Sequence, residues 1–287
     1  MTFNPNADIS GSKAERRGGR GAVVGGGIAG VGGILALVFA LLTGGSFDPN
    51  VIFGNQDQGS EAQATDGATC LTGVDANEND ECRLAGAQIL LDDFWSKHVK
   101  GYVSPTEVIY SGQTQSACGT ADNQVGPFYC PTDQKLYVDP SFFQLMRQQF
   151  GASAGNLAQL YIVGHEWGHH IQNITGVFEE HPNDGTGAES NSVRTELQAD
   201  CFAGGWLSQV TDTKGSDGKP LLEPITQDQL KDALNAAASV GDDNIQKRSG
   251  YVNPDSFTHG TSAERQKWFS TGYNEGINAC DTFSGAL

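Results

Sequence analysis

The clearest pattern of apolar and polar positions lies in the middle of the chain. Apolar residues recur there at steps of three and four, at Leu160, Val163, Trp167, Ile171 and Ile174. This spacing predicts an amphipathic helix with one buried stripe. Gly176 is placed to end this helix. Gly168 is unfavourable inside a helix, which indicates that another backbone comes close at this point.

Further helices and short strands follow from the same kind of pattern. Residues 84–100 carry apolar positions at helical spacing, Asp139 and Pro140 open a predicted helix towards Phe150, and residues 192–201 begin another. Three β-rich runs are separated by turn residues, at 108–110, 127–130 and 135–138. The last two runs are predicted to pair as a hairpin. The chain is therefore predicted to have an α+β fold that is rich in helices and has a small antiparallel sheet.

The N-terminal part has a different pattern. Residues 21–42 contain no charged side chain and follow a group of basic residues, Lys13, Arg16, Arg17 and Arg20. Such a run is long enough to cross about 30 Å of hydrocarbon, and the basic residues place its start on the cytoplasmic side. The predicted organisation is a cytoplasmic tail (1–20), a transmembrane anchor (21–43), a flexible linker (44–68) and an extracytoplasmic domain (69–287). A cleaved signal peptide is the alternative, because small residues follow the apolar run at 43–46.

The charge of the chain argues against one class of function, and its length and hydrophobic content indicate how many domains it forms. The chain has 17 basic and 34 acidic residues, a net charge of −17, which argues against binding to a nucleic-acid phosphate backbone. With 287 residues, of which 38% are hydrophobic, one main domain with a sizeable core is expected.

All six cysteines follow the predicted membrane span, on the side where disulfides persist. Fifteen pairings are open to six cysteines. Proximity along the chain favours Cys70 with Cys82 and Cys118 with Cys130, which leaves Cys201 with Cys280. A thiolate metal ligand at Cys201 is the alternative.

The predicted central helix carries an H-E-x-x-H motif, in which His165 and His169 are four residues apart. At this spacing both imidazoles lie on one helix face and can bind one zinc ion. Glu166 then lies beside the ion, where its carboxylate is placed to act as a general base.

A third ligand is expected on the following helix. Glu196 and Asp200 share one face of it, and a glutamate ligand followed by an aspartate that holds a ligating imidazole gives a His₂Glu zinc site with an open fourth position. The extended metzincin motif is excluded, because Gln172 and Thr175 stand where it needs glycine and histidine. A di-iron site is excluded because a second E-x-x-H is absent from the sequence.

Other polar residues near the motif are predicted to have supporting roles. His170 is interpreted as structural or as a neighbour of the ligands, and His98 as a surface or packing residue. The acidic loop 176–191 lacks the regular spacing of a calcium loop, so a solvated connection is the prediction and calcium binding the alternative.

The chain also resembles a known group, the bacterial YpfJ-type neutral zinc metallopeptidases. The resemblance covers most of residues 118–283 and rests on six blocks in order: 126–131, 136–139, 165–172, 196–201, 241–243 and 256–262. It implies a gluzincin-like zincin fold and a membrane-tethered zinc peptidase. In that resemblance His165, His169 and Glu196 are the zinc ligands and Glu166 is the catalytic base.

One further candidate comes from a second resemblance. His259 precedes Arg265 by six residues, which is similar to the T-H-P-x-x-x-x-R region of M48-type gluzincins, although Gly260 replaces the proline. The resemblance implies that His259 stabilises the oxyanion of the reaction. A helix-start or packing role for His259 is the alternative.

Together these observations predict a membrane-anchored endopeptidase that uses Zn²⁺ and acts on a peptide or protein substrate. Two other hypotheses remain open: a catalytically inactive scaffold that binds envelope proteins or peptides, and a metalloenzyme that cleaves a bond other than a peptide bond, for instance an amide in the cell envelope. The sequence predicts neither the substrate nor the oligomeric state.

Overall fold

The structure is a computed structural model, and it describes residues 2–18, 69–122, 125–150, 154–215, 217–248 and 250–287. The principal helices are α2 (Gly73–Glu78), α3 (Asp80–His98), α4 (Ser141–Leu145), α5 (Asn156–Ile174), α6 (Val177–Glu180), α7 (Asn191–Ser208), α8 (Gln227–Ser239), α9 (Asp242–Arg248) and α10 (Ser262–Glu275). A π-helical segment (Met146–Phe150) continues α4, and short 3₁₀ turns lie at Val210–Asp212, Pro254–Ser256 and Ile277–Ala279.

The strands form two small sheets. They are β1 (Glu15–Arg17), β2 (Thr106–Tyr110), β3 (Gln113–Ser116), β4 (Gly119–Asp122), β5 (Phe128–Cys130) and β6 (Lys135–Val138). The main sheet has the order β1-β2-β6-β5, and β3 pairs with β4 alone. The predicted hairpin of β5 and β6 is confirmed. The pairing of β3 with β4 is also antiparallel. The prediction of an antiparallel sheet is wrong for the rest of the main sheet, because β1 pairs with β2 and β2 with β6 in parallel. Parallel pairing depends on long connections, which a local pattern does not reveal.

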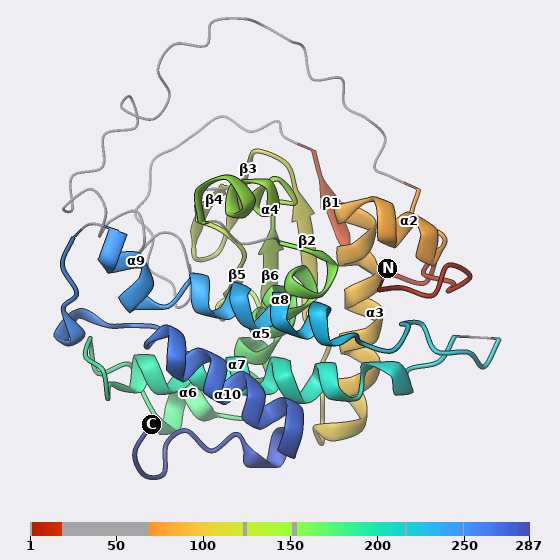
Figure 1. Cartoon of the computed structure of the whole chain (residues 1–287). Helices are drawn as coiled ribbons and strands as arrows, with labels where there is room; N and C mark the ends of the chain where they lie inside the picture. Colours follow the sequence, from red (N-terminus) through yellow and green to blue (C-terminus); the bar gives the residue numbers. More distant parts are fainter. Residues whose placement is uncertain (1, 19–68, 123–124, 151–153, 216, 249) are drawn as a thin grey trace, which may run out of the picture.

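Helix α5 lies at the centre of the molecule (Figure 1). It packs against β5 and β6 on one side, against α7 on the other, and also against α3 and α8. The apolar stripe predicted for it is buried at Leu160, Val163, Trp167 and Ile171. The helix ends at Ile174, and Gly176 follows in the left-handed region with φ of 86°. The helix-rich α+β prediction is thus confirmed.

Glycines allow α5, α7 and α10 to approach closely. A Cβ atom on Gly168 would lie 3.1 Å from Cα of Ala199, so the close backbone expected there belongs to α7. A Cβ atom on Gly272 of α10 would lie 1.8 Å from the carbonyl oxygen of Cys201 on α7. Side chains at these two positions would push α5, α7 and α10 apart. The close contact of the three helices positions the side chains of the candidate metal centre.

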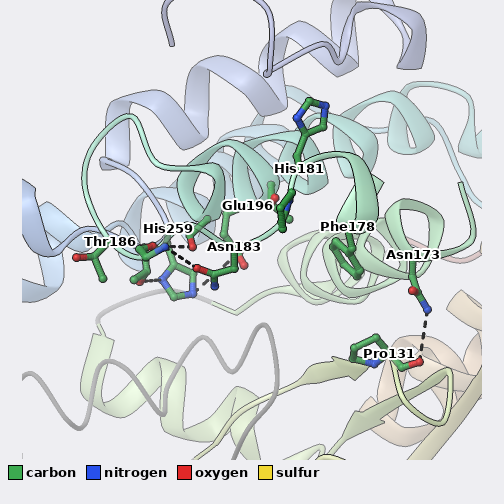
Figure 2. A pocket seen from close by; sticks show the side chains of 13 residues that line it. Pro131, Asn173, Phe178, His181, Asn183, Thr186, Glu196 and His259 are labelled. Atoms are coloured by element: carbon green, nitrogen blue, oxygen red, sulfur yellow. Dashed lines mark hydrogen bonds and ion pairs between the residues drawn. The ribbon is translucent and has the colours of Figure 1, made fainter. Parts of the chain in front are cut away.

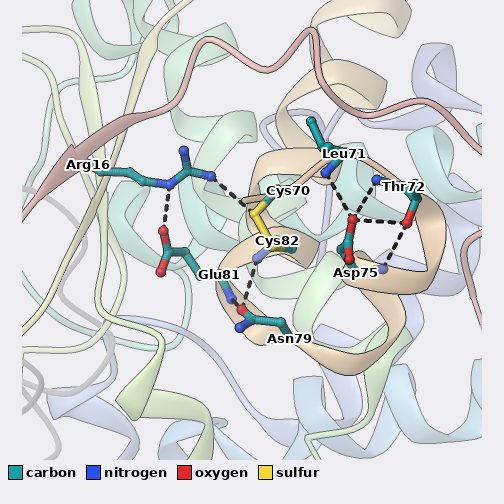
Figure 3. The surroundings of a disulfide bond; sticks show 8 residues. All are labelled: Arg16, Cys70, Leu71, Thr72, Asp75, Asn79, Glu81 and Cys82. Atoms are coloured by element: carbon teal, nitrogen blue, oxygen red, sulfur yellow. Dashed lines mark hydrogen bonds and ion pairs between the residues drawn. A yellow bond between two sulfur atoms is a disulfide. The ribbon is translucent and has the colours of Figure 1, made fainter. Parts of the chain in front are cut away.

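The three disulfides expected from chain proximity are confirmed: Cys70–Cys82, Cys118–Cys130 and Cys201–Cys280. Cys201 is therefore not a thiolate ligand. The first disulfide joins the start of the domain to α3, and Arg16 reaches across to Glu81 beside it (Figure 3). The third ties the end of the chain to α7 and so to the centre of the fold.

Residues 2–18, which the sequence analysis predicts to lie in a cytoplasmic tail (1–20), pack onto the domain. Phe3 and Ile9 are fully buried, and the Asn77 side chain accepts hydrogen bonds from the backbone of Phe3 and donates one back. Arg16, one of the basic residues on which the predicted membrane orientation rests, pairs with Glu81. The segment contributes β1 to the sheet, and its four buried residues, Thr2, Phe3, Ala7 and Ile9, do not follow a helical or alternating spacing that would have predicted it.

The membrane-spanning prediction concerns residues outside the described part of the chain. The predicted anchor at 21–43 and linker at 44–68 both fall there. Among the helices that the structure does describe, none combines the length and the apolar character needed to cross a membrane.

Candidate metal centre

Helix α5 carries the two motif histidines on one face, and both are buried. Glu196 reaches them from α7: one carboxylate oxygen lies 3.1 Å from Nε2 of His165, and the other lies 3.4 Å from Nε2 of His169. The possible ligand atoms of these three residues, one from each, lie within 4.8 Å of one another. The structure therefore brings together the three residues that the sequence proposed as ligands.

Local sequence accounts for the position of Glu196. Helix α7 begins at Asn191 because the Ser190 side chain accepts a hydrogen bond from the backbone of Val193, an N-terminal cap. Two turns along, Ala199 passes Gly168 of α5 at close range. This crossing point fixes the carboxylate of Glu196 opposite the imidazoles.

Asp200, one turn after Glu196, holds His165. Its Oδ1 lies 2.8 Å from Nδ1 of His165, so the imidazole donates its proton there. Nε2 of His165 then carries no proton and can bind a metal ion. The Arg265 guanidinium from α10 donates to both oxygens of Asp200, and the Tyr161 hydroxyl donates to Oδ1. Burial acts to raise the pKa of Asp200, but Arg265 and His165 outweigh it and hold the pKa at about 2. Asp200 is therefore an ionised partner of His165.

Gln172 holds the other imidazole, and sequence reasoning did not assign this role. Its Oε1 lies 2.8 Å from Nδ1 of His169. Its Nε2 donates to the carbonyl oxygen of Thr195 and to Oε1 of Gln198, whose own Nε2 donates to the carbonyl oxygen of Cys280. The position of Gln172 three residues after His169, one helical turn, is a signal that could have indicated it.

Glu166 lies on the same helix with its carboxylate directed at β5. Its Oε2 accepts a hydrogen bond of 3.0 Å from the backbone N–H of Tyr129, while Oε1 is buried without a hydrogen-bond partner among the described residues. Burial raises the pKa of Glu166 to about 8, against the opposing effect of His169. A carboxylate with one fixed and one open oxygen suits a group that accepts a proton.

His259 approaches the centre from the loop before α10. Its Nε2 lies 4.0 Å from Oε2 of Glu196 and, within the described part of the chain, has no hydrogen-bond partner. Nδ1 lies 2.8 Å from the Thr258 hydroxyl and 3.6 Å from Oδ1 of Asp242. The other oxygen of Asp242 accepts backbone hydrogen bonds from Thr258, His259 and Gly260. Asp242 thus fixes both the loop and the ring, a role that the sequence did not indicate.

The chemistry of these groups fits a zinc ion. Two imidazoles and one carboxylate are the ligand set of catalytic His₂Glu zinc sites, which keep a fourth position open. Nε2 of His169, like Nε2 of His259, is buried and has no hydrogen-bond partner among the described residues. A nitrogen that binds a metal ion is expected to lack such a partner. Burial opposes ionisation of Glu196, yet His169 and His259 lower its pKa well below the usual range, so the carboxylate is charged. The site would therefore offer zinc one anionic oxygen and two ring nitrogens.

The remaining histidines of the sequence analysis lie away from the ligands. His170 is tied to the Tyr129 hydroxyl and to the carbonyl oxygen of Val103, and burial lowers its pKa, so it is structural. His98 stacks on Phe94 and bonds the Phe94 carbonyl oxygen, which is a packing role.

A cleft of about 500 Å³ opens beside the centre, and Glu196 and His259 form part of its wall. Figure 2 shows Glu196 between two ends of this cleft. Phe178, Asn173 and Pro131 lie at one end, and Asn183 and Thr186 lie with His259 at the other. A ligand of moderate size can therefore reach the proposed metal position from solvent.

The chain is similar to a described protein family and to proteins of two bacteria. The model of a family described as "Putative neutral zinc metallopeptidase" matches residues 5–283. Uncharacterized protein Rv2575 of Mycobacterium tuberculosis is 46% identical over 228 residues, which cover 78% of this chain and 78% of that protein. Uncharacterized protein YpfJ of Escherichia coli is 40% identical over 226 residues, 75% of each chain. No solved structure matches the chain significantly.

Proposed function

This chain belongs to the neutral zinc metallopeptidase family, and from that membership and the geometry of its centre we propose that it is a zinc-dependent endopeptidase with Glu166 as general base. The single observation that carries the proposal is the convergence of His165, His169 and Glu196, of which Glu196 also lines an accessible cleft. The open oxygen of the adjacent Glu166 supports it.

The residues of the chain have distinct parts in the proposed reaction. Bound zinc supplies Lewis acidity that polarises a peptide carbonyl and acidifies water. Glu166, held at Oε2 by the Tyr129 N–H, accepts the proton of the attacking water at Oε1 and later delivers it to the leaving amine. The reaction needs no covalent intermediate with the protein.

We propose that His259 stabilises the oxyanion. Its Nε2 is directed towards Glu196 and has no partner among the described groups, so it is available to donate a hydrogen bond to a substrate oxygen. Asp242 keeps the ring in this position through its contacts with Nδ1 and with three backbone N–H groups. A preorganised donor of this kind acts on charge that develops in the transition state.

The experiment uses the purified full-length protein. Bound metal is measured by mass spectrometry, and cleavage of a peptide library is compared between the wild type, Glu166→Gln and a control, Glu223→Gln, in which the same change is made at an exposed site. Cleavage by Glu166→Gln is expected to fall about 10²–10⁴-fold at unchanged zinc content. Equal cleavage by Glu166→Gln and the wild type would remove Glu166 from the mechanism. Bound zinc without cleavage in any variant would favour a peptide-binding scaffold.

Attachment to a membrane through residues 21–43 is a separate part of the proposal, supported by the length of their uncharged run. Because residues 2–18 pack on the domain, a single crossing would require them to detach. Fractionation of cells into membrane and soluble parts tests attachment, with a variant lacking residues 21–43 as the control. Recovery of the full-length protein in the soluble part would contradict it.

A further inference from the structure

The cleft beside the metal centre has an apolar end that lies directly against a proposed ligand. The ring of Phe178, on the short helix α6, has its centroid 6.5 Å from that of His169. Pro131 faces the same end and follows β5, the strand whose Tyr129 N–H holds Glu166 (Figure 2). A side chain bound between Phe178 and Pro131 would therefore belong to a residue next to the bond that is cleaved.

The walls of the cleft carry little charge. Of the 13 described residues that line it, none is lysine, arginine or aspartate, and the one carboxylate is that of Glu196, a proposed metal ligand. At the far end the Thr186 hydroxyl donates to the carbonyl oxygen of Asp255 and the Thr258 hydroxyl bonds His259, so these polar groups already have partners. Apart from the imidazoles of His181 and His259, the described walls thus provide no cationic side chain that could neutralise an acidic substrate side chain.

The two residues after Phe178 on its helix are acidic. Glu179 and Glu180 follow Phe178 on α6 and are exposed. An aspartate or glutamate of the substrate placed at this end would lose water and lie in a cleft whose one lining carboxylate, Glu196, has the same sign. An aromatic or branched aliphatic side chain would instead bury apolar surface against Phe178 and Pro131.

We propose, on the basis of the peptidase function proposed above, that the substrates are polypeptides with an aromatic or branched aliphatic residue adjacent to the scissile bond. Phe178 is the specificity-determining residue, and it acts by binding that side chain. Acidic residues are excluded from the same position. A cleft of about 500 Å³ is large enough for this residue together with its neighbours along the peptide, which fits an extended substrate.

The experiment uses internally quenched peptides that differ at one position. The background is glycine, alanine and serine, and the variable residue is Phe, Leu, Glu or Lys; mass spectrometry of the products identifies the bond cleaved. The enzymes are the full-length wild type, Phe178→Ala and Phe178→Lys. The control is Val177→Ala, a change on the same helix outside the described cleft lining. Melting temperatures show whether each variant is folded.

The wild type is expected to cleave beside Phe or Leu with a kcat/KM at least about tenfold above that for Glu. Phe178→Ala should bring this ratio close to one, mainly through KM, and Phe178→Lys should shift the preference towards Glu, while Val177→Ala should leave it unchanged. A wild type that cleaves the Phe and Glu peptides equally, or an unchanged ratio in Phe178→Ala, would overturn the assignment and leave the peptidase function standing.

A wild type that cleaves none of the peptides would instead count against the proposed function. The role of Phe178 is then tested by binding. Fluorescein-labelled Phe and Glu peptides are titrated with each protein, and binding is followed by anisotropy. Tighter binding of the Phe peptide that is lost in Phe178→Ala supports the apolar site. Equal binding of the two peptides overturns it.

Discussion

Arg265 and Asp200 form a two-pronged ion pair in a region where both side chains are fully buried. Nε of Arg265 lies 2.7 Å from one carboxylate oxygen, and Nη2 lies 2.9 Å from the other. The pair joins α10 to α7 behind the metal centre. Because the carboxylate stays ionised, it can hold His165 in the orientation that a ligand requires.

Replacing Arg265 by leucine is expected to destabilise the fold by about 3–5 kcal/mol, because it leaves the Asp200 carboxylate buried without its cation. The double variant with Asp200→Asn should recover part of this loss. Urea unfolding at pH 7 measures both, with Lys267→Leu, an exposed position on the same helix, as control. An effect of Arg265→Leu no larger than that of the control would show that the pair does not stabilise the fold.

The ion pair of Arg265 and Asp200 is expected to help the fold resist unfolding at low pH. Since the pKa of Asp200 is lowered in the folded state to about 2, its contribution to stability is present above the unfolded pKa near 3.8 and is lost as the pH falls through about 2. In Arg265→Leu the pKa rises, so the acid unfolding transition should begin at a higher pH than in the wild type. Coincident acid transitions of the two proteins would contradict this.

Gln172→Leu is expected to weaken zinc binding about 10–100-fold with little change in fold, because Nδ1 of His169 loses the acceptor that orients the ring. Competition with a chromophoric chelator measures the zinc dissociation constant without reference to activity. Gln198→Leu, which removes an acceptor from Gln172 and leaves its contact with His169 in place, should have a smaller effect. The reverse order of the two variants would argue against this role for Gln172.

The buried carboxyl group of Glu107 is expected to make the fold less stable at alkaline pH. It lies on β2, its two carboxylate oxygens have no hydrogen-bond partner among the described residues, and burial raises its pKa from 4.5 to about 8. The folded state therefore favours the protonated form, so this contribution is complete below pH 4.5 and declines as the pH rises through 8.

Glu107→Gln should accordingly match the wild type at pH 5 and exceed it at pH 9 by up to about 4–5 kcal/mol, at 1.36 kcal/mol for each unit of pKa shift. Urea unfolding at the two pH values provides the comparison, and the exposed change Glu223→Gln should leave the pH profile as it is. Parallel profiles for the wild type and Glu107→Gln would show that Glu107 does not titrate in this range.

Phe3 tests whether the N-terminal segment is part of the domain. Its ring is fully buried over Gly86, where a Cβ atom would lie 2.6 Å from it. Phe3→Ala is expected to cost about 3–5 kcal/mol and to expose residues 2–18 to proteases, whereas Ser10→Ala, an exposed change in the same segment, should do neither. Unaltered stability and proteolysis would mean that the segment does not dock in solution.

Much of the centre was predictable because it depends on neighbours along one helix. The steps of three and four from Leu160 to Ile174 define α5, and the four-residue spacing of His165 and His169 places both rings on one face of it. The same spacing between Glu196 and Asp200 predicts that they share a face of α7. Resemblance to a family, rather than periodicity, pointed to His259.

Contacts between distant segments were decided only by the tertiary structure. The parallel strands of the sheet, the docking of Phe3 beside Leu222, and the support of His259 by Asp242 each join segments whose pairing no local repeat encodes. Spacing along the chain thus predicted helices α3, α4, α5 and α7, and the faces of α5 and α7 that carry chemistry, because side-chain spacing and backbone propensity act over a few residues. Packing decided which faces meet, because the approach of α5, α7 and α10 depends on how all their side chains fit together at once.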